Sequence, residues 1–144
     1  MEVRNMKKSI ENIVKHSEVS EKAIEAYLNK RAKESGLLCL KYSNANTTGY
    51  PDRLLCLPYG QCVWVELKSK GKKPTKVQLI RIDELRGLNH NVFIIDSKAD
   101  IDTLIDSVNE WRKMMDRLSA EQQANAEAAA MREYEKVINK LPKN

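Results

Sequence analysis

Residues 51–68 read PDRLLCLPYGQCVWVELK, and the pairing of strands in the centre of the sheet follows from this segment. Two short apolar runs flank a turn-forming sequence at residues 58–61, so an antiparallel hairpin is the simplest pairing. Because side chains alternate along a strand, Glu66 and Lys68 point to the same face. The hairpin also returns Asp52 to the end of the strands where Glu66 lies. Two carboxylates and a lysine are therefore expected to converge at one edge of a sheet.

The remaining elements follow from apolar periodicity and from capping residues. They are a helix at 21–35, strands at 37–42, 53–57 and 62–67, a helix at 75–88, a strand at 91–96 and a helix at 97–111. The helix at 75–88 begins with a capping-box sequence, and its expected buried residues are Val77, Ile80, Leu85 and Leu88. The order predicts an α/β fold, in which helices flank a mixed four-stranded sheet.

Charge is distributed unevenly along the chain. The first 96 residues carry 17 Lys and Arg against 11 Asp and Glu, whereas the remainder carries 8 against 9. A run without intervening acid comprises Lys68, Lys70, Lys72, Lys73 and Lys76. Such a run suits a polyanion such as nucleic acid, although a solvated lysine-rich loop is the plain alternative.

The three cysteines and the hydropathy indicate the class of protein. An odd number of cysteines without CxxC spacing argues against a disulfide framework and against a zinc site. Reduced thiols predict a cytoplasmic protein. No apolar run approaches the roughly 20 residues of a membrane-spanning helix, and residues 1–15 lack the apolar segment of a secretory signal.

Converging carboxylates repel each other unless a cation lies between them. Asp52, Glu66 and the carbonyl of Leu67 are hard oxygen ligands of the kind that suits Mg²⁺ or Mn²⁺. A bound ion would polarise a phosphate and activate a water molecule, and Lys68 would offset charge in the transition state. The alternative for a glutamate two residues before a lysine is an ordinary surface ion pair.

The pattern of Pro51 and Asp52 followed by Glu66-Leu67-Lys68 resembles the PD-(D/E)xK nuclease superfamily. Four segments occur in the order found in one branch, the virus-type replication-repair nuclease (VRR-NUC) domain. They are SEKAIEAYL at 20–28, GYPDRL at 49–54, VELK at 65–68 and PTKVQ at 74–78. The resemblance covers roughly residues 20–106.

The resemblance implies a restriction-endonuclease-like core that hydrolyses DNA phosphodiester bonds with a divalent metal, Mg²⁺ or Mn²⁺. It further implies a homodimer acting on branched DNA such as four-way junctions. Asp52 and Glu66 match the metal ligands, and Lys68 matches the catalytic lysine. A glutamate of the first helix completes the set: Glu25 ranks first and Glu21 second.

Other residues carry supporting roles. Gln78 matches a family glutamine near the site, and its alternative role is the capping box. The basic residues Lys70, Lys72, Lys73 and Lys76 are expected to bind nucleic acid.

The chain is expected to divide into three parts. These are an N-terminal arm at 1–19, the nuclease core at 20–106 and a helical extension at 107–144. Alanines give the extension high helix propensity, and Met131, Tyr134, Ile138 and Leu141 form a thin apolar stripe. The homodimer could form through this extension or through the core. Two rival functions are a non-catalytic nucleic-acid-binding module and a subunit of a larger nuclease assembly.

Overall fold

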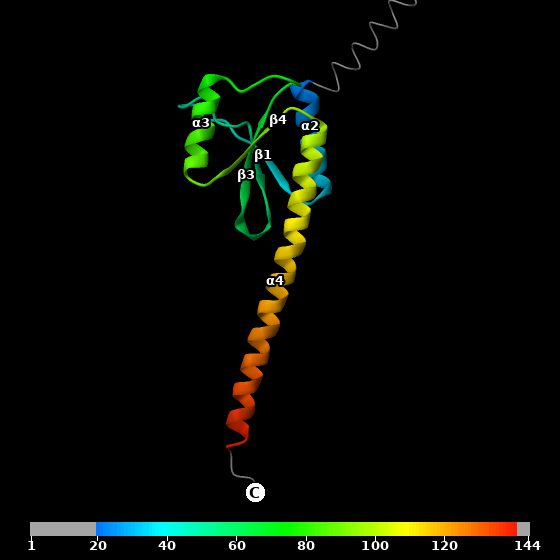
Figure 1. Ribbon diagram of the computed structural model, residues 1–144, viewed down its shortest axis with the longest axis vertical. Helices are drawn as coiled ribbons and strands as arrows, with labels where there is room; N and C mark the ends of the chain where they lie inside the picture. Colours follow the sequence, from blue (N-terminus) through cyan, green and yellow to red (C-terminus); the bar gives the residue numbers. More distant parts are fainter. Residues whose placement is uncertain (1–19, 141–144) are drawn as a thin grey trace, which may run out of the picture. The chain divides into compact units, whose positions relative to one another are not determined.

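A computed structural model describes residues 20–140 of the chain (Figure 1). Its strands are β1 (Leu38–Lys41), β2 (Arg53–Cys56), β3 (Cys62–Leu67) and β4 (Asn91–Ile95). Its helices are α2 (Glu21–Glu34), the short 3₁₀ helix η1 (Pro58–Gly60), α3 (Lys76–Gly87) and α4 (Lys98–Ile138). The predicted arm at residues 1–19 lies outside the described residues.

The four strands form one mixed sheet in the order β1-β2-β3-β4. β1, β2 and β3 pair antiparallel, and Arg53 of β2 stands opposite Val65 of β3. β4 pairs parallel to β3, because α3 crosses over between them and reverses the chain. The predicted α/β fold, with its hairpin at residues 53–67 and its mixed four-stranded sheet, is therefore confirmed.

One face of the sheet is covered by α2 and by the first turns of α4 (Figure 1). The core there contains, from the helices, Ile24, Leu28, Ala32, Ile101, Leu104, Ile105 and Val108. From the sheet it contains Leu55, Val63, Val65, Leu67 and Ile95. Ser20 begins α2, since its side chain accepts a hydrogen bond from the Ala23 amide at 3.1 Å. Gly36, at φ +66°, follows the end of the helix.

The opposite face carries α3 and a smaller core. Ile82, Leu85 and Val92 are buried there, and Tyr50 and Trp64 pack against them. The expected buried face of this helix was partly wrong, because Val77, Ile80 and Leu88 are exposed. In α3 the apolar residues surround the helix rather than forming one stripe, so periodicity did not identify the buried side.

Helix α4 is longer than the sequence interpretation allowed. A helix to residue 111 and a separate peripheral helix were expected, but one helix runs from Lys98 to Ile138. Residues 112–138 contain neither glycine nor proline, so no residue ends the helix.

The chain divides into two compact units between Val108 and Asn109. In the second unit, the side chains of Met131, Tyr134 and Ile138 from the predicted apolar stripe are exposed along the helix, and Leu141 lies outside the described residues. Across residues 20–140, no helix is both long enough and apolar enough to cross a membrane.

Candidate active site

Asp52 and Glu66 lie at the same end of the β2–β3 hairpin. Asp52 immediately precedes β2, and its carbonyl accepts a hydrogen bond from the Tyr42 amide at 2.7 Å. Continuing the register of Arg53 with Val65 by one residue places Asp52 opposite Glu66. The structure thus brings together the two carboxyl groups that the hairpin interpretation paired.

Glu66 is a fully buried carboxyl group, with 0% of its surface exposed. The Lys68 ammonium lies 3.1 Å from its Oε1, yet neither carboxylate oxygen accepts a well-formed hydrogen bond. Burial raises the pKa of Glu66 to about 7; the Lys68 ammonium opposes this rise, and the negative charge of Asp52 adds to it. The group is therefore poised between its neutral and ionised forms near neutral pH.

Asp52 is half-buried, and its environment raises its pKa, as the environment of Glu66 does. Burial raises the pKa of Asp52, the Lys68 ammonium opposes the rise, and the charge of Glu25 adds to it. Lys68 is therefore the cation that faces both carboxyl groups. A second cation at this end of the hairpin would stabilise the ionised forms of both.

The two glutamates of α2 have different surroundings. Glu25 forms an ion pair with Arg53, whose side chain points, like that of Val65, toward the α2 side of the sheet. Glu21 stands one turn earlier on α2, and its negative charge contributes to the raised pKa of Glu66. Glu25 is thus ion-paired with Arg53, while the negative charge of Glu21 raises the pKa of Glu66 at the end of β3.

Gln78 takes part in the capping box that the sequence predicts. The Thr75 hydroxyl accepts a hydrogen bond from the backbone N–H of Gln78 at 3.3 Å. The backbone N–H of Thr75 donates to the side-chain Oε1 of Gln78 at 2.9 Å. The cap fixes the first turn of α3. It does not by itself link Gln78 to Asp52 or Glu66.

The lysine loop, residues 69–75, connects β3 to α3. Lys70, Lys72 and Lys73 are exposed in it, and Lys76 is exposed at the start of α3. The Gly71 amide donates to Asp96 Oδ2 at 2.9 Å, which ties the loop to the end of β4. This role of Asp96 was not predicted, because the sequence places Asp96 at the end of a strand but does not show which loop packs against that end.

The metal-binding capacity of the site rests on few protein ligands. Within residues 20–140, no three or more His, Cys, Asp and Glu side chains form a group that could hold a metal ion. Mg²⁺, however, commonly keeps several waters and is bound through one or two carboxylates. Asp52, the Leu67 carbonyl and the buried Glu66 carboxyl group, whose only charged partner in the described residues 20–140 is Lys68, fit that mode of binding.

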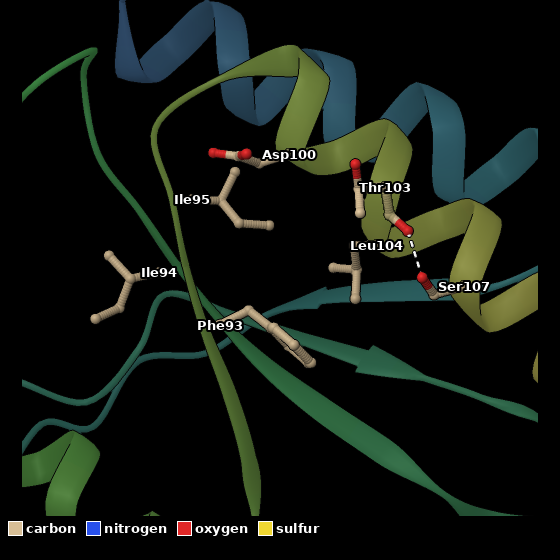
Figure 2. Close-up of a pocket in the computed structure, with 7 residues that line it drawn as sticks. All are labelled: Phe93, Ile94, Ile95, Asp100, Thr103, Leu104 and Ser107. Atoms are coloured by element: carbon tan, nitrogen blue, oxygen red, sulfur yellow. Dashed lines mark hydrogen bonds between the residues drawn. The ribbon is translucent and has the colours of Figure 1, made fainter.

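A pocket of about 360 Å³ lies elsewhere, between β4 and the first turns of α4 (Figure 2). Its lining residues are Phe93, Ile94, Ile95, Asp100, Thr103, Leu104 and Ser107. Thr103 and Ser107 donate their hydroxyl hydrogens to helix carbonyls, at 3.1 and 2.7 Å. The pocket contains none of the predicted site residues, so the chemistry is assigned to the hairpin end.

Known proteins resemble this chain in sequence and in fold. No family model matches it. It is 35% identical over 91 residues to "Putative nuclease p44" of Acyrthosiphon pisum secondary endosymbiont phage 1, covering 63% of this chain and 97% of that protein. A solved structure described as "VRR_NUC domain" matches with a TM-score of 0.57 and 33% identity, over 60% of this chain and 94% of its own. Both relatives are thus matched over nearly their whole length.

Proposed function

The chain belongs to the VRR-NUC family of nucleases, and we propose that it hydrolyses DNA phosphodiester bonds with the help of a divalent metal ion. The observation that supports the proposal most directly is Glu66, a fully buried carboxyl group that faces a second carboxyl group, Asp52, with the Lys68 ammonium beside it. Because burial raises the pKa of both carboxyl groups even with Lys68 facing them, a further cation would be needed to stabilise both in the ionised form.

The proposed site contains Asp52, Glu66 and the Leu67 carbonyl as metal ligands. When bound, a divalent ion such as Mg²⁺ or Mn²⁺ supplies Lewis acidity and lowers the pKa of a water molecule. Lys68, at 3.1 Å from Glu66, holds that carboxylate and presents positive charge to the reacting phosphate. Gln78 is proposed to contribute its side chain from the capped first turn of α3.

A helix glutamate is proposed as the fourth acid. The electrostatic influence of Glu21 on Glu66 supports Glu21, whereas the influence of Glu25 on Asp52 supports Glu25. The ion pair with Arg53 gives Glu25 a structural role of its own. Separate substitution of the two residues distinguishes these roles.

The substrate is proposed to be branched DNA, such as a four-way junction, bound by a homodimer. The exposed lysines of the lysine loop follow β3, which carries Glu66 and ends just before Lys68, so they can contact the phosphates flanking the cleaved bond. Two cuts at related positions need two identical sites, which a two-fold dimer provides. The core proposed at residues 20–106 carries the site, and residues 107–144 form the extension.

A cleavage panel tests the proposal. Duplex, single-stranded, flap and four-way DNA are incubated with the protein in Mg²⁺, in Mn²⁺ and in EDTA. We expect metal-dependent cleavage that is fastest on the four-way substrate. Asp52→Asn and Lys68→Ala should each lower the rate by roughly 100-fold or more while DNA binding survives.

Other outcomes of the panel favour the rivals. DNA binding without cleavage in any metal would favour a non-catalytic binding module or a subunit that needs a partner. Cleavage that survives in Asp52→Asn at the wild-type rate would refute the assignment of the site.

A further inference from the structure

The segment that delivers Asp52 to the site is fastened to α3. We call residues 42–52, between β1 and β2, the approach loop. Arg81 of α3 donates from Nε to the carbonyl of Thr48 at 3.2 Å, and its guanidinium group lies 5.4 Å from the centre of the Tyr50 ring. Glu84, one turn along the helix, holds the same guanidinium group at 2.7 Å. One arginine therefore contacts the loop twice, on either side of Gly49.

Gly49 shows how closely the loop approaches the helix. A Cβ built at Gly49 would lie 2.7 Å from Val77 Cγ1, 3.1 Å from the Val77 carbonyl oxygen and 3.2 Å from Arg81 Cγ. Its φ of +95° is also one that L residues rarely adopt. The loop thus rests directly on the helix and has no room to move closer.

Packing continues from Arg81 to the carboxyl group. The Tyr50 hydroxyl donates to Glu84 at 3.4 Å, and the Tyr50 ring meets Tyr42 edge-on at 6.1 Å. Tyr42 in turn packs edge-on against Trp64 at 5.0 Å, and its amide binds the Asp52 carbonyl. Pro51, directly before Asp52, is fully buried. Asp52 is therefore held at the end of a continuous packed path.

Asp52 needs such restraint because it faces another carboxyl group. Two like charges at the end of a hairpin separate unless the backbone that carries them is held. We propose that Arg81 is a positioning residue, which fastens the approach loop to α3 and so keeps the Asp52 carboxylate beside Glu66. The inference rests on the proposed function of Asp52 as a metal ligand.

The test compares two arginines of the same helix. Arg86 is the matched control, because it too donates to a backbone carbonyl, that of Val92 at 2.8 Å, but makes no contact with the approach loop. Binding of Mn²⁺ alone to the full chain is followed by electron paramagnetic resonance of the free ion. Arg81→Met should weaken Mn²⁺ binding by about 10-fold to 100-fold, and Arg86→Met should leave it at the wild-type value.

Further measurements separate positioning from general loss of stability. Thermal unfolding should show a larger loss of stability in Arg81→Met than in Arg86→Met, because Arg81 has more partners, so Mn²⁺ affinities are compared at a temperature at which both variants are fully folded. Cleavage by Arg81→Met should recover at high Mn²⁺, because the reacting groups themselves are intact. Arg81→Lys should recover only part of the affinity, since an ammonium group lacks the planar set of donors. If Arg81→Met is too unstable to purify, Arg81→Lys against Arg86→Lys decides the question.

Each result has a defined meaning. Wild-type Mn²⁺ affinity in Arg81→Met, combined with a loss of affinity in Asp52→Asn, overturns the positioning role and leaves the proposed function standing. Wild-type affinity in Asp52→Asn overturns the proposed function, and the role of Arg81 with it. Equal losses of affinity in the Arg81 and Arg86 variants would reduce Arg81 to a stabilising residue.

Discussion

Glu66 makes the stability of the metal-free protein depend on pH. Its carboxyl group titrates near 4.5 in the unfolded chain and at about 7 in the fold, chiefly because it is buried. Between these values the folded protein binds a proton that the unfolded chain has released. The contribution of Glu66 to the free energy of unfolding should therefore fall as the pH rises from about 4.5 to about 7, by up to about 3 kcal/mol, and stay constant outside this window.

Urea unfolding in EDTA at pH 5 and pH 8 measures this effect. Glu66→Gln should lose most of the difference between the two pH values, since an amide does not titrate. Glu133→Gln, in which an exposed acid of α4 is replaced, should keep the wild-type difference. A Glu66→Gln variant with wild-type pH dependence would show that other groups cause it.

The two glutamates of α2 should respond differently to substitution. Glu25→Gln leaves Arg53 without its ion-pair partner in a site where only 11% of the arginine side chain is exposed, so we expect a stability loss of about 2 kcal/mol. Glu21→Gln should weaken Mn²⁺ binding with little loss of stability. Thermal unfolding and Mn²⁺ titration of both variants decide the question. If Glu25→Gln weakens Mn²⁺ binding more than Glu21→Gln, Glu25 is the fourth acid.

At the scale of single residues, the sequence predicted what alternation and one hairpin determine. Asp52 and Glu66 are opposite each other because strand register and a short turn leave little choice. The partner of Glu25 and the loop contacts of Arg81 were not predictable. Helical periodicity places both residues on a helix but says nothing of the neighbour that each side chain meets in three dimensions.

The contribution of the lysine loop to DNA binding can be measured from the salt dependence of the DNA affinity. Changing Lys70, Lys72 and Lys73 together to Gln should weaken binding to every DNA sequence alike. The slope of log affinity against log salt should flatten by up to about 3, because fewer counterions are released. A control with the same net charge replaces three exposed lysines of the second unit, Lys113, Lys136 and Lys140, and should keep the slope. An unchanged slope in the loop variant would place the DNA elsewhere.

Elements were predicted well where local signals were strong. β3 spans residues 62–67 as expected, and the other strands agree to within a residue or so at each end. The buried face of α3 and the continuity of α4 were not predicted. The buried face of α3 depends on how the approach loop covers the helix. The continuity of α4 follows from the absence of any residue that stops a helix, and the change in composition after Trp111 obscured that signal.

For the whole molecule, the predicted homodimer would use the second unit. Its helix exposes Met114, Leu118, Met131, Tyr134, Val137 and Ile138. Light scattering at micromolar concentration should give twice the chain mass of 16.5 kDa. Met131→Glu with Ile138→Glu should lower the mass toward that of one chain, whereas Ala129→Glu should not. A dimer that survives the double substitution would place the contact on the core.

The order of the strands has a consequence for how fast the chain folds. β2 joins β3 through the short turn at residues 57–61 and β1 joins β2 through the approach loop, whereas β4 joins β3 only after the longer crossover through α3. Local antiparallel pairs close with a smaller loss of chain entropy, so they are expected to form first. Asp52 and Glu66 then meet early, before most of the core can offset their repulsion.

Repulsion between the two carboxylates should therefore lower the rate of folding. In stopped-flow refolding without metal, Asp52→Asn should fold faster than the wild type above pH 7, where both carboxyl groups of the unfolded chain are ionised. Near pH 4, where Glu66 of the unfolded chain is largely protonated, the two rates should approach each other. Equal rates at both pH values would mean that the hairpin closes after the slowest step. The like charges proposed to bind a metal in the finished enzyme would thus be the same charges that delay its formation.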